Sequence, residues 1–326
     1  MVKPQKNLVL IALGGNALLG VGEERGFDAQ RRRIRETARR VVDVVEEGYQ
    51  PIITHGNGPQ VGDILRRYEL TKEWFPPMPL DVCDAESQGF LGYMFLNAFN
   101  NAFVEAGLDI EVVYLLTRVV VDPNDKAFKV PTKPIGPYYS NEDLEKIKDM
   151  GYSLREVHPG RWRRVVPSPD PKEVLEINSI RDLVEAGCLV IAGGGGGIPV
   201  IKDRYGRLRG VEAVVDKDLT SSLIAQKLGV ETLLILTDVK RVSINFRRDN
   251  QVDLDHLTLE EAKKYLAEGH FWAGSMAPKI EAAIRFLEAK PGGKVVISAV
   301  DRVREALHGD GTIITKNTRF GPASSS

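Results

Sequence analysis

The chain has 326 residues, and its 44 basic and 45 acidic side chains leave a formal net charge of −1. This balance excludes the global positive field that draws nucleic acid or an acidic membrane surface, so neither partner is expected. A chain of this length can bury a core without disulfides or a structural metal, as one large α/β unit or two closely joined lobes. Neither a signal-peptide core nor a run of about 20 apolar residues occurs, which predicts a cytoplasmic protein.

The first part of the chain predicts a strand, a helix and a second strand. Residues 8–13 are continuously apolar, as in a strand covered on both faces. From Asp28, the expected N-cap, apolar side chains recur at helical spacing until Gly48, and residues 51–54 form the second strand. Such a unit is a right-handed crossover of a parallel sheet. The alternation continues with a helix at 87–106, a strand at 110–121, a helix at 180–186 and a strand at 189–192.

Residues 122–171 interrupt this alternation. Prolines recur on both sides of a short polar helix near 141–150, a pattern that predicts an inserted flap or subdomain. Residues 317–326 lack apolar periodicity and are expected to be a disordered or added tail. Between these regions the expected elements are helices at 218–228 and 275–289, and strands at 232–236, 294–298 and 311–315.

Cysteine and arginine usage points to structural roles. Cys83 and Cys188 have no metal-ligand spacing and are interpreted as reduced, structural thiols. The arginines within residues 31–40 recur on one helix face without interleaved aromatic residues, which indicates a solvated face rather than an RNA site. The arginines that flank Trp162 fit either closure over a phosphate or a structural cation–π contact.

Three strand-to-glycine junctions suggest a ligand rich in phosphate. Glycine lets backbone N–H groups approach an anion, and a following helix N-terminus adds a favourable field. One such cluster is more often an ordinary tight turn, so the signal lies in the recurrence. The patterns of P-loop proteins, protein kinases and Rossmann dinucleotide sites do not occur. The junctions are Gly14-Gly15-Asn16, Gly56-Asn57-Gly58 and Gly193–Gly197.

Six motifs follow one another along the chain, and two of them contain the first two glycine junctions. They are LGGNAL at 13–18, THGNGPQVG at 54–62, PTKPIGP at 131–137, WRRVVPSP at 162–169, GVEAVVDKD at 210–218 and GSMAPK at 274–279. Together they resemble the motifs of carbamate kinases in the amino acid kinase superfamily, over residues 7 to 316. The resemblance implies a three-layer αβα sandwich with a largely parallel central sheet and a small protruding flap subdomain.

The resemblance also implies an activity and a division of the chain. It implies a homodimer that transfers a phosphoryl group reversibly between MgATP and carbamate, giving ADP and carbamoyl phosphate, in arginine metabolism. Residues 1–205 are expected to bind carbamate or carbamoyl phosphate, with the flap inserted at about 122–171. Residues 206–316 are expected to bind the nucleotide.

By resemblance, three lysines and one aspartate carry catalysis. Lys217 neutralises the phosphoryl group in flight, Lys279 holds ATP phosphate, and Lys133 in the flap supplies the third cation. Asp218 orients the lysines, and Lys217 is expected to point outward from the start of its helix. The plainer alternatives are a capping aspartate beside solvated lysines, and an assignment of the flap cation to the neighbouring Lys129.

The ligand contacts are also implied by the resemblance. Carbamate presents an anionic oxygen and needs no general base, so His55 is interpreted as a buried, hydrogen-bonded side chain. Gly14, Gly15 and Asn16 are expected to face the phosphoryl bridge, and Gly56, Asn57 and Gly58 to bind the carbamate or its phosphorylated product. The expected nucleotide contacts are Gly194, Gly195, Thr237, Asp238, Ser275, Met276 and Lys279.

The chain departs from the family pattern at several places. Ser243 stands where Tyr is common, Ala277 stands where Gly is usual, and residues 81–89 are acidic through Asp84 and Glu86. Two rival functions stay open. A kinase for another small acid, such as acetylglutamate, is disfavoured by the flap and by Ala12, which occupies the place of a lysine in such kinases. A noncatalytic nucleotide-binding or storage protein is disfavoured by the retained lysines and aspartate.

Overall fold

A largely parallel sheet forms the centre of the molecule. The computed structural model describes residues 7–15, 18, 26–147, 150–246, 248–272 and 274–317, with the backbone alone at Lys146 and His158. Within this described part of the chain the main sheet has eight strands in the order β15-β17-β16-β12-β1-β2-β9-β3, and every neighbouring pair is parallel except β16 and β17. Their bounds are β1 Asn7–Leu13, β2 Tyr49–His55, β3 Val112–Tyr114, β9 Leu189–Ile191, β12 Thr232–Thr237, β15 His256–Thr258, β16 Lys294–Ala299 and β17 Thr312–Thr315.

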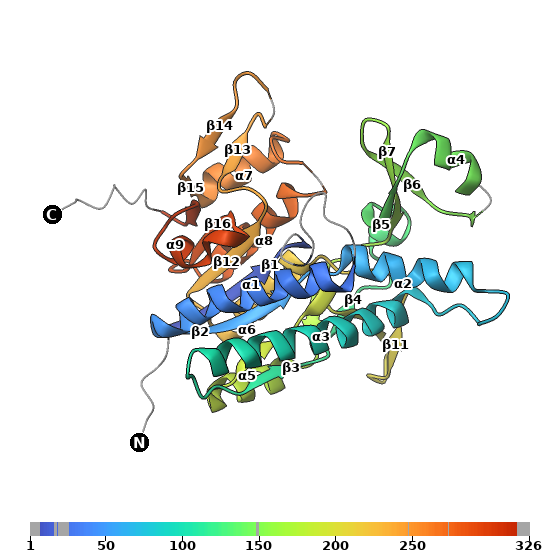
Figure 1. Cartoon of the computed structure of the whole chain (residues 1–326). Coiled ribbons are helices and arrows are strands. Elements are labelled where there is room, and N and C mark those ends of the chain that lie inside the picture. Colours follow the sequence, from blue (N-terminus) through green and yellow to red (C-terminus); the bar gives the residue numbers. More distant parts are fainter. Residues whose placement is uncertain are drawn as a thin grey trace.

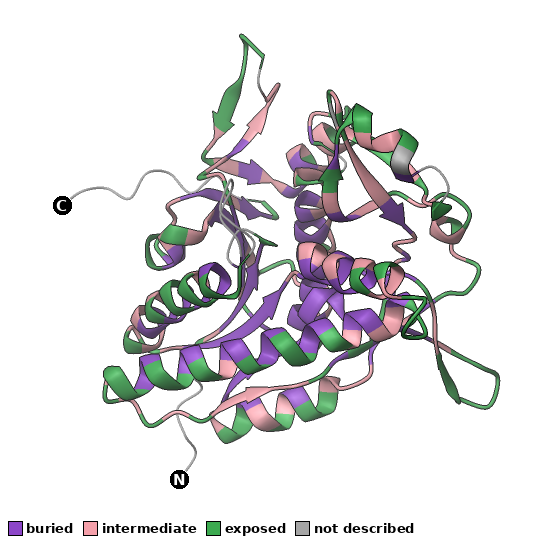
Figure 2. Cartoon of the chain, turned by 45° about the vertical axis from the view of Figure 1, so that its right-hand side comes forward, coloured by how far each residue is buried: buried purple, intermediate pink, exposed green. Residues whose placement is uncertain are grey.

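Helices cover both faces of this sheet because its central strands are apolar on both sides. On β1, Leu10 and Ala12 belong to one buried cluster, whereas Val9, Ile11 and Leu13 belong to the other. Figure 2 shows the buried residues gathered on the strands and on the inner sides of the helices. The result is the three-layer αβα fold expected from the sequence. One face carries α1 Phe27–Glu46, α3 Leu80–Glu105 and α9 Val303–Leu307, and the other carries α5 Ile177–Ala186, α6 Lys217–Leu228, α7 Leu259–Ala267 and α8 Met276–Ala289.

The N-cap of the first helix and the strand predicted at 110–121 differ from the structure. Helix α1 begins at Phe27 with Gly26 as N-cap, so Asp28 lies in the first turn instead, where its carboxylate favours the helix dipole. The strand predicted at 110–121 is two strands, β3 and β4 Arg118–Val121, which belong to different sheets. Between them Thr117 is fully buried, and its N–H donates to Gln88. A polar residue satisfied by side chains breaks the ladder there and redirects the chain.

The region predicted as a flap carries a small antiparallel sheet of its own, in the order β5-β7-β6. It consists of β5 Lys133–Tyr139, β6 Leu154–His158 and β7 Arg161–Val166, with α4 Asn141–Ile147. Figure 1 shows it protruding above α2 Gly58–Leu70. A second sheet, β11-β10-β4-β8, joins the flap to the main body through β4, β8 Pro171–Val174, β10 Ile198–Lys202 and β11 Leu208–Gly210.

Several structural interpretations of single residues are confirmed. Cys83 and Cys188 are free and buried. Of the flap arginines, Arg161 lies 4.1 Å and Arg163 5.2 Å from the ring centroid of Tyr138, so both make cation–π contacts. Among the helices of the described residues, none is long and apolar enough to cross a membrane.

Candidate active site

The site begins at the N-terminus of α6. Asp216 is the N-cap, and its Oδ1 accepts the backbone N–H groups of Asp218 at 2.9 Å and Leu219 at 3.4 Å. The capping aspartate considered in the sequence is therefore Asp216 rather than Asp218. Because Asp216 satisfies the helix end, the carboxylate of Asp218 is left to bind side chains.

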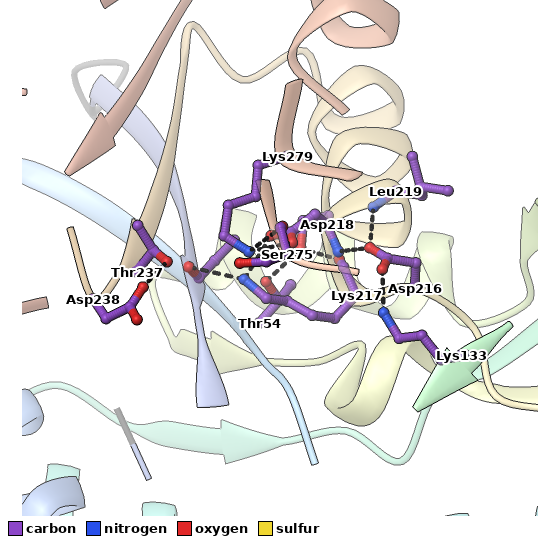
Figure 3. Close-up of polar contacts among 12 residues, drawn as sticks. Thr54, Lys133, Asp216, Lys217, Asp218, Leu219, Thr237, Asp238, Ser275 and Lys279 are labelled. Carbon is purple, nitrogen blue, oxygen red and sulfur yellow. Dashed lines mark hydrogen bonds and ion pairs between the residues drawn. The ribbon is translucent and has the colours of Figure 1, made fainter. Parts of the chain in front are cut away.

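Asp218 lies between two lysines (Figure 3). Its Oδ1 is 2.6 Å from Nζ of Lys217, and its Oδ2 is 3.1 Å from Nζ of Lys279, which comes from α8. Lys217 and Lys279 are each 9% exposed and Asp218 is 3% exposed. The expectation that Lys217 points outward is wrong, since its ammonium is turned inward toward Asp218 and toward the carbonyl oxygen of Ala12 at 3.3 Å. The three groups form a buried cluster with an excess of positive charge.

The pKa values of the three residues in this cluster are shifted in different ways. Burial alone would raise the pKa of Asp218, but the two ammonium groups outweigh it and hold that pKa below its ordinary value. Burial lowers the pKa of Lys217 in spite of Asp218. Burial also opposes the charge of Lys279, but Asp218 and Asp216 outweigh it and raise the pKa of that lysine. Asp218 is therefore ionised, and Lys217 is the cation whose charged form a further negative charge would stabilise most.

The flap brings a third lysine to the cluster. Lys133 at the start of β5 forms an ion pair with Oδ2 of Asp216. Lys129 lies instead at the C-cap of the 3₁₀ helix η2 Lys126–Phe128. One carboxylate thus caps α6 through one oxygen and holds the flap lysine through the other.

Close backbone packing fixes the flap on α2. A Cβ added to Gly62 would lie 2.1 Å from both Cα and N of Gly136 in β5. Farther along α2, Glu69 pairs with Arg164 and accepts a hydrogen bond from Tyr152. Glycine at position 62 is therefore required for the close approach of β5 to α2. This approach sets the position of Lys133, at the start of β5, relative to Asp216.

Gly62→Ala is expected to lower turnover by about 100-fold, because displacement of the flap moves Lys133 off the cluster. Gly89→Ala is the matched control, since Gly89 lies in α3 with open space around it. Steady-state kinetics and thermal unfolding of both variants give the comparison. Equal turnover in the two variants would contradict the role of this contact.

The first two glycine turns lie side by side at the ends of β1 and β2. Gly14 donates its N–H to Leu236 at 3.0 Å, and Gly56 donates its N–H to Leu13 at 3.1 Å. A Cβ on Gly56 would lie 3.8 Å from N of Gly15 and 3.8 Å from Cγ of Lys217. The two turns and Lys217 therefore converge, as the assigned roles require. Asn57 is the N-cap of α2, Gly58 is its first residue, and Asn16 lies outside the described residues.

The five-glycine run packs against the second turn. A Cβ on Gly195 would lie 2.2 Å from Nδ2 of Asn57, and one on Gly194 would lie 2.3 Å from the hydroxyl of Tyr114. Gly193 and Gly195 have φ values of 62° and 66°, which favour glycine. These contacts make the run a buried floor below the Asn57 turn. Binding of nucleotide by Gly194 and Gly195 stays a prediction.

The other predicted nucleotide contacts lie near Lys279. Thr237 ends β12 and donates its hydroxyl to Asp238 at 3.0 Å, and Figure 3 shows both beside the lysine cluster. Ser275 is the N-cap of α8, and its carbonyl accepts a hydrogen bond from Lys279 at 3.3 Å. Met276 begins that helix. Ser243, at the place of the usual Tyr, donates to Asp253 within the hairpin of β13 Val242–Ile244 and β14 Val252–Leu254.

His55 is a buried structural side chain, as interpreted from the sequence. It is 0% exposed, with Nδ1 3.0 Å from the carbonyl of Gly56 and Nε2 2.9 Å from the hydroxyl of Tyr114. Burial lowers its pKa to about 4. The imidazole is therefore neutral at physiological pH and joins the second turn to β3.

The pKa of His55 predicts a loss of stability in acid. The unfolded chain binds the proton at its ordinary pKa of 6.5 and the folded chain only at about 4, so stability is present above pH 6.5 and is lost as the pH falls. From pH 7 to 4 this group is expected to remove about 3 kcal/mol from the free energy of unfolding. Urea unfolding of the parent and of His55→Gln at both pH values measures it. An equal pH dependence in the two proteins would contradict the assignment.

Asp216 and the buried side chains around Asn57 were not among the predicted site residues. Asp216 directly precedes the Lys217-Asp218 pair, so an aspartate just before the predicted helix was a usable signal. Asp84, Ser87 and Gln88 carry no such local signal, because they lie within a helix.

Comparison with known proteins identifies the class. The amino acid kinase family is matched over residues 7–298. The carbamate kinase of Pyrococcus horikoshii is 45% identical over 94% of this chain and 98% of its own length, and that of Latilactobacillus sakei is 43% identical over 95% and 99%. The solved carbamate kinase from Giardia lamblia bound to AMP-PNP is 40% identical over 96% and 99%, with a TM-score of 0.86. The chain belongs to the amino acid kinase family and, within it, to the carbamate kinases.

This membership makes the chain a phosphotransferase. The N-acetylglutamate synthase from Neisseria gonorrhoeae, solved with coenzyme A and N-acetyl-glutamate, is 16% identical with a TM-score of 0.55. That protein shares the fold alone. The carbamate kinase interpretation of the sequence is confirmed.

Proposed function

We propose that this chain catalyses reversible transfer of the γ-phosphoryl group between MgATP and carbamate, with Lys133, Lys217 and Lys279 as the cations and Asp218 as their organiser. The observation that carries the proposal is the buried Lys217-Asp218-Lys279 cluster beside the two glycine turns. The AMP-PNP bound to the Giardia lamblia relative supports ATP as the nucleotide.

The geometry supports a division of labour. Lys217 lies against the Gly14 and Gly56 turns, where it can neutralise the phosphoryl group as the bond to ADP oxygen breaks and the bond to carbamate oxygen forms. Lys279 donates to the carbonyl of Ser275, and we assign it to the phosphates of the nucleotide. Carbamate supplies an anionic nucleophile, so no side chain has to remove a proton. Positioning and charge neutralisation then account for catalysis.

The residues of this site fit an Mg²⁺ ion that is bound by the nucleotide rather than by protein side chains. Both oxygens of Asp218 face lysines, and Asp216 is engaged by the helix end and Lys133. Within the described residues, no group of three or more His, Cys, Asp and Glu side chains could hold a metal ion. We propose that phosphate oxygens bind the ion, which offsets negative charge during the transfer.

The test mixes the protein with carbamoyl phosphate and MgADP and measures ATP. We expect ATP from carbamoyl phosphate and none from acetylglutamyl phosphate, which separates the two kinases. A folded protein that binds ADP but forms no ATP would refute the enzyme and favour a nucleotide-binding protein. The direction used in the cell, a cytoplasmic location and a place in arginine metabolism stay predictions.

We also propose that the protein is a homodimer. The outer face of α3 exposes Phe90, Tyr93 and Val104, which are 37%, 64% and 71% exposed. Apolar side chains along a solvent-facing helix suit a contact with a second copy of the chain. Sedimentation equilibrium should give twice the chain mass, and the chain mass at micromolar concentration would refute the proposal.

A further inference from the structure

One face of α3 is polar although it is completely buried. Asp84, Ser87 and Gln88 are each 0% exposed. Their spacing of three and four residues places them on the same side of the helix. Buried polar groups are retained where hydrogen bonds satisfy them, so the partners of this face indicate what it does.

The partners lie in two glycine turns and at Thr117, between β3 and β4. Asn57 donates its amide to Oδ1 of Asp84 and, at 2.6 Å, to the hydroxyl of Ser87. Gln88 donates its amide to the carbonyl oxygens of Gly194 at 2.9 Å and Thr117 at 3.1 Å. One helix face therefore holds the Gly56-Asn57-Gly58 turn and the glycine floor below it.

Asp84 fixes the orientation of the Asn57 side chain. Both N–H bonds of that amide are used by Asp84 and Ser87, so its carbonyl oxygen must face the other way. The same amide packs directly on Gly195, where an added Cβ would overlap it. The Asn57 side chain therefore cannot move toward the five-glycine run. The turn is held from its side and from below.

The second oxygen of Asp84 is buried without a hydrogen-bond partner among the described residues. The titratable groups that face this carboxyl are Asp81 on its own helix and Tyr114 on β3, with His55 on β2 bonded to Tyr114. Burial raises the pKa of Asp84 to about 8, and Asp81 adds to this, whereas the bond from Asn57 opposes it. A protonated carboxyl can accept the amide of Asn57 without leaving a buried charge beneath an anion site.

We propose that Asp84 is a positioning residue for the phosphoryl acceptor, because it holds Asn57 and thereby sets the turn on which carbamate or carbamoyl phosphate binds. This inference rests on the proposed function of that turn. Loss of a positioning residue should weaken binding of the acceptor and leave binding of the nucleotide unchanged. Loss of a merely structural residue should weaken both.

Asp84→Leu keeps the branched shape and the number of heavy atoms of the side chain and removes the acceptor of the Asn57 amide. Its KM for carbamoyl phosphate is expected to rise at least about tenfold, with the KM for ADP within about twofold of the parent. Glu86→Gln is the matched control, because Glu86 is an exposed carboxylate on the same helix. Parent-like kinetics in a folded Asp84→Leu protein, or an equal rise in both KM values, would overturn the proposal.

Asp84→Asn tests the protonated form. The amide keeps an acceptor for Asn57, so the KM for carbamoyl phosphate is expected to stay within about threefold of the parent at pH 7. From pH 7 to 9 the parent loses its proton at Asp84 and its KM rises, whereas the KM of the variant rises less. Identical pH profiles, or a tenfold rise already at pH 7, would overturn the proposal.

Ser87→Ala covers the case in which Asp84→Leu does not fold. It removes only the second acceptor of Asn57, and the KM for carbamoyl phosphate is expected to rise about threefold. No change in this value would count against the proposal. The assay of the parent protein distinguishes failure of the proposed function from failure of the Asp84 proposal. An inactive parent refutes the proposed function, whereas an active parent with unaffected variants refutes the role of Asp84 alone.

Discussion

Lys217→Met is expected to lower kcat by at least about 100-fold, because it removes the positive charge that we propose neutralises the phosphoryl group in transfer. Its effect on stability is expected to be small. Burial already lowers the pKa of Lys217 in spite of Asp218, so the folded chain gains little from this charge until substrate arrives. Lys279 still pairs with Asp218 in the variant.

The measurements are kcat, both KM values and the midpoint of urea unfolding. Lys227→Met is the matched control, since Lys227 is exposed in the last turn of the same helix. A kcat within tenfold of the parent would remove Lys217 from the mechanism. A large loss of stability with intact kcat would make it a structural lysine.

Asp218→Asn is expected to reduce both stability and activity. The substitution leaves two lysines, each 9% exposed, without the carboxylate that lies between them. Uncompensated buried charge of this kind costs about 3–5 kcal/mol of stability. Turnover is expected to fall by about 100-fold or more, since neither ammonium keeps its position.

A double variant separates the two effects. Asp218→Asn combined with Lys217→Met removes one charge of each sign, so part of the lost stability is expected to return while activity stays low, and Lys279 still lacks its carboxylate. Urea unfolding of the single and double variants completes the cycle. Strictly additive losses of stability would show that the two side chains do not interact.

Local patterns predicted the parts of the fold that local chemistry determines. The apolar runs before Gly14 and Gly56 are the central parallel strands β1 and β2, with Leu13 paired to His55 in register. Asp84, by contrast, lies in a helix predicted to start only at residue 87, whereas α3 begins at Leu80, directly after Pro79. Its function depends on Asn57, which is 27 residues away in the sequence.

Four residues of the candidate site were predicted from the sequence, but their arrangement was not. The motifs indicated Lys133, Lys217, Asp218 and Lys279, and the structure brings these residues together through Asp216. The Lys217 side chain points inward toward Asp218, which also pairs with Lys279. Lys279 lies 61 residues after Asp218 in the sequence. Contacts at such separations are set by packing of whole elements, which no local pattern reports.

The order of the central strands also sets the distance between the two proposed substrate sites. β1 lies between β2, which leads to the Asn57 turn, and β12, which leads to Thr237 and Asp238. Neighbouring strands are about 4.8 Å apart, so the acceptor side and the nucleotide side are separated by about 10 Å, with the Gly14 turn midway. The spacing of the strands therefore sets the distance between the two turns at which we propose that the acceptor and the nucleotide bind.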